Sequence, residues 1–130
     1  MKINIVQNDA GLGKEKTKIV NHFLEFLYDR MPLEETQNIY FLGKRGHDMT
    51  TGEYQTKEGD IRILSKGRML IDVLRTLAHE WIHGAEHEIL GWNKGPDIGG
   101  PNENLCNIYA AMLLKEYQNQ FPEHKKILYS

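Results

Sequence analysis

The segment from Arg68 to Leu90 constrains the fold of this chain more than any other part of its sequence. Projected on a helix at about 100° per residue, its apolar side chains fall within one stripe about 140° wide. The stripe consists of Leu70, Leu74, Leu77, Ala78, Trp81, Ile82, Ala85 and Ile89. A helix with such a stripe must bury it against another layer. The sequence therefore predicts a long amphipathic helix packed on a sheet.

The opposite face of this helix carries a histidine motif, His79-Glu80-Trp81-Ile82-His83. With His79 set at zero, His83 lies at about 40° and Glu80 at about 100°, on the arc that the apolar stripe leaves free. Side chains four residues apart in a helix stand one above the other, so both imidazoles can reach one tetrahedral ion at about 2.0 to 2.1 Å. A catalytic zinc needs a third protein ligand as well, and an open position for water. Glu80 lies beside the pair and can take a proton from that water.

A second helix is expected from Glu103 to Gln118, and Asn102 can cap it. Glu103 and Asn107 are four residues apart and therefore share one face of this helix. Alanines near the same face, one to two turns further on, are small enough to let the two helices approach closely. Such an approach can bring the Glu103 carboxylate to the metal.

The two motifs together resemble those of the ImmA/IrrE-type peptidases. In this chain His-Glu-x-x-His is followed by Glu-x-x-Cys-Asn-x-Tyr-Ala-Ala-Met-Leu-Leu, and the second motif of that family runs Glu-x-x-Ala-Asn-x-Phe-Ala-Ala-x-Leu-Leu. The wider gluzincin class is similar in taking a glutamate from the following helix. The resemblance implies Zn2+ as the cofactor, with His79, His83 and Glu103 as its ligands. It also implies that Glu80 is the general base and that Asn107 orients a ligand histidine.

The resemblance covers about Asp60 to Leu114 and implies an activity as well as a site. A zinc metalloendopeptidase of this kind hydrolyses peptide bonds in a protein or peptide substrate. An edge strand near Ile61 to Leu64 is expected to hold that substrate extended. The chain departs from the family pattern at Trp81, where many relatives have a smaller aliphatic residue, and at Cys106, where alanine is usual. No helix-turn-helix domain accompanies the motifs, and the minimal size suits a peptidase encoded by a phage or prophage.

The rest of the chain predicts a small sheet and a supporting helix. Apolar spacing predicts an amphipathic helix from Lys14 to Met31, and one more helical turn is expected after Pro122. Strands are expected at residues 3–7, 37–42, 53–57 and 60–64, the last two forming a hairpin around residues 58–59. We expect one α+β domain over residues 1–130, a minimal gluzincin-like fold with a small, mostly antiparallel sheet packed on the active-site helix.

Composition limits the partners and the compartment. Sixteen basic and eighteen acidic residues give a net charge of -2 without a long run of one sign, so neither nucleic acid nor an anionic membrane is expected as a partner. The N-terminus turns polar too early for a signal peptide, and no apolar run reaches membrane-spanning length. The single cysteine, Cys106, excludes an internal disulfide and fits the cytoplasm. The oligomeric state is not readable from these features.

Several alternatives stay open at this point. His87 continues the polar arc and is an alternative third ligand, although one straight helix spreads three such residues over about 12 Å. A zinc-stabilised binding or assembly protein would keep the same ligands without turnover. Tyr54, Tyr109 and His47 are candidates for stabilising the oxyanion of a tetrahedral intermediate, and the sequence does not choose among them.

Overall fold

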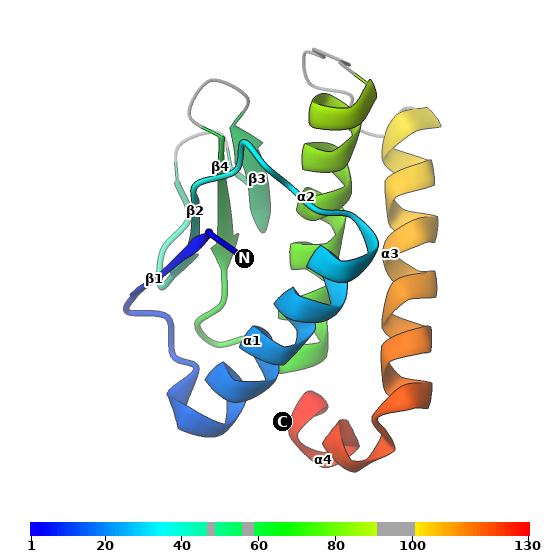
Figure 1. The fold of residues 1–130 in the computed structure, drawn as a ribbon. Helices are drawn as coiled ribbons and strands as arrows, with labels where there is room; N and C mark the ends of the chain where they lie inside the picture. The colour runs from blue at the N-terminus through cyan, green and yellow to red at the C-terminus, as the bar shows by residue number, and fades with distance from the viewer. Residues whose placement is uncertain (47–48, 56–58, 91–100) are drawn as a thin grey trace.

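A computed structural model describes residues 1–46, 49–55, 59–90 and 101–130, and it has the α+β character expected from the sequence (Figure 1). The strands are β1 (Asn4–Asn8), β2 (Asn38–Leu42), β3 (Gly52–Gln55) and β4 (Asp60–Leu64). The helices are α1 (Gly13–Arg30), α2 (Leu70–Leu90), α3 (Pro101–Gln120), a 3-10 turn η1 (Pro122–His124) and α4 (Lys125–Leu128). Residue 58 of the expected hairpin turn at residues 58–59, and the loop at residues 91–100, lie outside the described residues. None of the described helices combines the length and the apolar character that a membrane crossing requires.

The four strands form one mixed sheet in the order β1-β2-β4-β3. β1 pairs with β2 and β2 with β4 in parallel, whereas β3 and β4 pair antiparallel. The prediction of a mostly antiparallel sheet is therefore wrong. Alternating apolar residues mark a strand but do not fix its direction, and α1 supplies the helical crossover that a parallel β1/β2 pair requires.

The position of β4 corrects a second expectation. β4 contains residues 61–64, the segment expected to form a free edge, yet it lies between β2 and β3. β3 is an edge strand and contacts α2, whereas the other edge strand, β1, lies at the far side of the sheet. Among the described strands, β3 therefore provides the edge on this side of the sheet.

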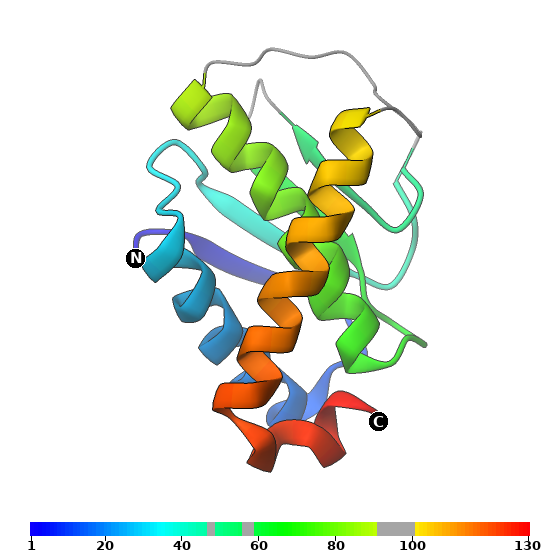
Figure 2. The same ribbon diagram turned by 90° about the vertical axis from the view of Figure 1, so that its right-hand side faces the viewer.

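The core lies between one face of the sheet and α1 and α2. Ile39 and Phe41 of β2 and Ile61 and Ile63 of β4 are fully buried on this face. The apolar stripe of α2 is buried as the sequence predicts, from Leu70 to Ala85. Figures 1 and 2 show that α2 lies between the sheet and α3, so it contacts a layer on each side.

Trp81 accounts for part of this packing. Its side chain is completely buried, and its indole Nε1 donates a hydrogen bond of 2.8 Å to the main-chain carbonyl of Met31, directly after α1. The large indole thus ties the end of α1 to the middle of α2. This contact gives a structural reason for a tryptophan inside the histidine motif.

Candidate metal centre

The two histidines of the motif lie side by side on α2, on the face turned away from the buried stripe. Their Nε2 atoms are 3.1 Å apart, and their ring centroids are 4.8 Å apart. The four-residue spacing on a regular helix produces this geometry directly.

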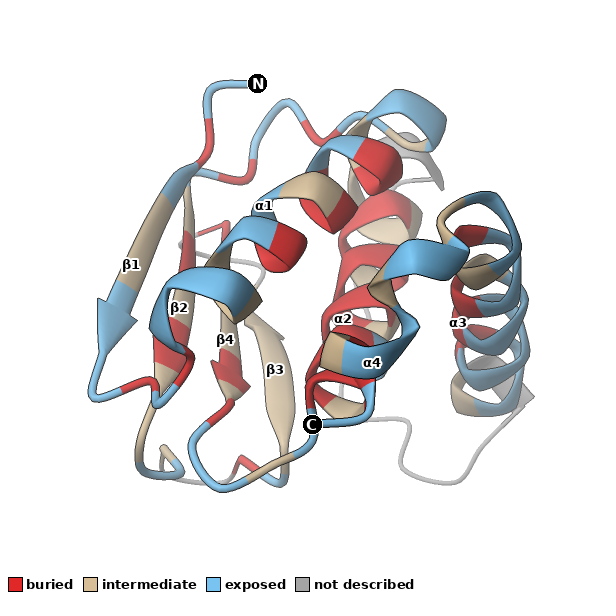
Figure 3. Cartoon of the chain, turned by 90° about the horizontal axis from the view of Figure 1, so that it is seen from below, coloured by how far each residue is buried: buried red, intermediate tan, exposed pale blue. Residues whose placement is uncertain are grey.

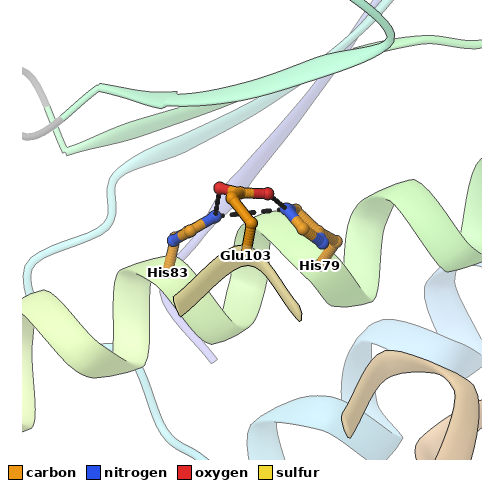
Figure 4. A group of neighbouring side chains, drawn as sticks. All are labelled: His79, His83 and Glu103. Carbon is orange, nitrogen blue, oxygen red and sulfur yellow. Dashed lines mark hydrogen bonds and ion pairs between the residues drawn. The ribbon is translucent and has the colours of Figure 1, made fainter. Parts of the chain in front are cut away.

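Glu103, in the first turn of α3, points at both imidazoles (Figure 4). One carboxylate oxygen lies 2.7 Å from Nε2 of His79, and the other lies 2.7 Å from Nε2 of His83. The packing of α3 on α2 makes this possible, because the residues of α3 that face α2 include the small Cys106 and Ala110, which are 1% and 0% exposed. The structure therefore brings together the three residues that the sequence singles out as ligands.

These three side chains offer donor atoms that could hold one metal ion. Ligand atoms at about 2.0 to 2.1 Å from a tetrahedral zinc are separated by about 3.3 Å. Here the two Nε2 atoms are 3.1 Å apart, and each carboxylate oxygen lies 2.7 Å from its nearest Nε2. Two imidazole nitrogens and a carboxylate are the donor set of a catalytic rather than a structural zinc. The side chains of His79, His83 and Glu103 are 15%, 20% and 24% exposed, so solvent reaches the group.

Glu86 and Cys106 lie behind His83, on the side away from the candidate ion. Nδ1 of His83 is 3.5 Å from a carboxylate oxygen of Glu86 and 3.8 Å from Sγ of Cys106. The thiol donates a hydrogen bond of 3.0 Å to the same oxygen of Glu86. Burial and this hydrogen bond raise the pKa of the Cys106 thiol far above its ordinary value, so the thiol stays protonated and acts as a donor.

The sequence reasoning missed Glu86. A carboxylate facing the outer nitrogen of a ligand histidine fixes its tautomer and raises its basicity. The available signal was the three-residue spacing between His83 and Glu86, which places both on one face of α2. Asn107, the residue expected to orient a histidine, is exposed on α3, and the described residues give its side chain no hydrogen bond.

Glu80 is buried, with 8% of its surface exposed, between α2 and the start of β3. Burial, together with the nearby carboxylates of Glu103 and Glu53, raises its pKa to about 8. Gly52 makes room for this arrangement, because a Cβ there would lie 3.1 Å from Cγ of Glu80 and 2.6 Å from Cγ2 of Thr76. The first residue of β3 is thus closely packed over the candidate general base.

The remaining candidates are more dispersed. His87 lies one turn beyond His83 and is not part of the group formed by His79, His83 and Glu103. Its ring centroid is 5.9 Å from that of Tyr54 on β3, and its Nδ1 is buried without a hydrogen-bond partner among the described residues. Tyr109 is 55% exposed on the outer face of α3, and His47 lies outside the described residues.

Comparison of the chain with protein-family models, with curated proteins and with solved structures found no match.

Proposed function

We propose that this chain is a zinc-dependent metallopeptidase that hydrolyses peptide bonds in a protein or peptide substrate. The observation that carries the proposal is the convergence of His79, His83 and Glu103, from two different helices, on one point that solvent reaches. Within the described residues this group contains three protein donors. A set of three leaves one tetrahedral position for water, as catalytic zinc sites require. With one cysteine the chain cannot form an internal disulfide, which fits a reducing compartment. The proposal therefore places the enzyme in the cytoplasm.

Each residue of the centre has a role in this proposal. Nε2 of His79, Nε2 of His83 and the carboxylate of Glu103 hold the ion, and Glu86 keeps the His83 ring oriented through Nδ1. A bound zinc ion supplies Lewis acidity, which polarises the scissile carbonyl and lowers the pKa of water to about 7. Glu80 accepts the proton of the attacking water and passes it to the leaving amine.

The edge strand β3 is the proposed support for the substrate backbone. Among the described strands it has one neighbour, β4, so the main-chain groups on its other side are free to pair. Its first residue packs against Glu80, which brings this edge close to the proposed base. An extended peptide added along β3 would therefore pass next to the metal centre.

The test combines metal analysis with a hydrolysis screen on the full chain. We expect one zinc per chain in the wild type and in Glu80→Gln, and a loss of zinc in Glu103→Ala. Wild-type protein should cleave an unfolded protein or members of a peptide library, and both a chelator and Glu80→Gln should abolish cleavage. Undiminished cleavage by Glu80→Gln would rule out its role as the base.

A zinc-stabilised binding or assembly protein is the competing function, and the same samples separate the two. That function predicts a fourth protein ligand, no hydrolysis in any screen and loss of folding on chelation. Equal zinc content in the wild type and in Glu103→Ala would refute the ligand set that both functions share.

A further inference from the structure

The outer face of α3 carries four large apolar side chains that remain strongly exposed. Leu105, Ile108, Tyr109 and Met112 are 52%, 56%, 55% and 60% exposed. Ile108, Tyr109 and Met112 follow Leu105 by three, four and seven residues, so the four side chains lie along one line on the helix. We call these four side chains the outer stripe. Figure 3 shows this face of α3 in the colour of exposed residues, opposite the buried face that contacts α2.

α3 has an inner apolar face besides the outer stripe, and this inner face packs the helix against the rest of the fold. Cys106, Ala110, Leu114 and Tyr117 already bury the inner face, with exposed fractions of 2% or less. A helix in a monomer needs one apolar face, and its other face is ordinarily polar. Here no charged residue occurs from Asn104 to Leu114, over three turns of the helix. A second apolar face of this length is a candidate interaction surface.

We propose that the outer stripe is the interface of a symmetric dimer in which two copies of α3 pack antiparallel. A two-fold axis between Ile108 and Tyr109 would place Leu105 of each copy against Met112 of the other. Ile108 of each copy would then meet Tyr109 of the other, so the stripe is complementary to itself. A parallel pair would bring the two Lys115 side chains close together, whereas the antiparallel pair separates them.

The available area agrees with a reversible dimer. The exposed fractions correspond to roughly 500 Å² per copy, so a pair that covers all four side chains would bury about 1,000 Å². This area is near the lower limit for a specific interface, where weak and transient complexes are found. A membrane surface fits less well, because helices that bind lipid flank their apolar face with several Lys and Arg, and α3 contains one basic residue, Lys115.

Sedimentation equilibrium of the full chain tests the proposal. The apparent mass should rise from 15.1 kDa toward twice that value as the concentration increases from about 1 to 200 µM. Met112→Lys should weaken dimerisation at least about tenfold. Met69→Lys is the matched control, because Met69 is 42% exposed but lies before α2, and it should leave the dissociation constant unchanged. Circular dichroism should show that both variants keep the wild-type fold.

Disulfide trapping tests the orientation. In an oxidised mixture of Leu105→Cys and Met112→Cys chains, the antiparallel dimer should give mainly the mixed disulfide, while the native Cys106, at 1% exposure, stays unreactive. A monomer at every concentration would overturn the proposal, as would a dimer that Met112→Lys leaves intact. Predominance of the two symmetric disulfides, or binding of the monomer to anionic vesicles, would overturn it as well.

Discussion

Replacing Glu80 with glutamine should change how the stability of the metal-free chain depends on pH. Burial, together with the carboxylates of Glu103 and Glu53, raises the pKa of Glu80 from 4.5 in the unfolded chain to about 8 in the folded one. Between these two values the folded state keeps a proton that the unfolded state has released. The carboxyl group therefore makes the folded state progressively less stable as the pH rises from about 4.5 to 8.

The size of the effect follows from the shift in pKa. Compared with a neutral side chain in the same place, Glu80 lowers the free energy of unfolding by about 1 kcal/mol at pH 5 and by about 4 kcal/mol at pH 8. Glutamine is close to the protonated carboxyl in size and carries no charge at either pH. The stability advantage of Glu80→Gln over the wild type should therefore grow by about 3 kcal/mol between pH 5 and pH 8.

Urea denaturation in the presence of a chelator, at pH 5 and at pH 8, measures this difference. The two proteins share all their other side chains, so comparing them isolates Glu80. Glu25→Gln, at an exposed position of α1, is the control and should follow the wild type at both pH values. With zinc bound, the positive charge lowers the pKa of Glu80, and the advantage of glutamine at pH 8 should shrink. An advantage that stays constant within about 0.5 kcal/mol from pH 5 to pH 8 would refute the burial argument.

Three further substitutions test separate parts of the structure. Trp81→Phe removes the hydrogen bond to Met31 and leaves a cavity, so urea denaturation should show a loss of about 2 to 4 kcal/mol; a change below 0.5 kcal/mol would contradict that contact. Glu86→Gln should weaken zinc binding about 10- to 100-fold in a chelator competition without unfolding the chain, because His83 loses its carboxylate partner. Gly52→Ala should cost about 1 to 3 kcal/mol in thermal unfolding, since its Cβ would lie 2.6 Å from a methyl carbon of α2; an unchanged melting temperature would show that β3 lies further from α2.

Sequence patterns predicted the structure correctly where a feature depends on a single helix. The buried stripe of α2 follows from the periodicity of its apolar residues, and the proximity of His79 and His83 follows from their four-residue spacing. The convergence of Glu103 needed a second motif, because residues on different helices meet only through tertiary packing. Local patterns could not give the direction and order of the strands, since these depend on how the connections cross the sheet.

The same limit explains the two differences at the centre itself. Asn107 shares a helix with Glu103, but its side chain points outward once Cys106 and Ala110 occupy the contact with α2. Glu86 lies beside His83 because the two residues share one face of α2. Their three-residue spacing in the sequence already indicated this. Which of two polar residues faces a ligand is decided by the rotation of one helix against the other.

The order of strands in the sheet has a consequence for how the chain folds. The parallel pairs join residues far apart in the sequence, with Asn4 beside Asn38 at a separation of 34 residues and Asn38 beside Asp60 at 22. Glu53 and Arg62, which face each other across β3 and β4, are separated by only 9. Closing a short loop costs less entropy and is faster, so the β3/β4 hairpin should form early in refolding and β1 should join the sheet late. The β3/β4 pair, which packs next to Glu80, would then form before β1 joins the sheet.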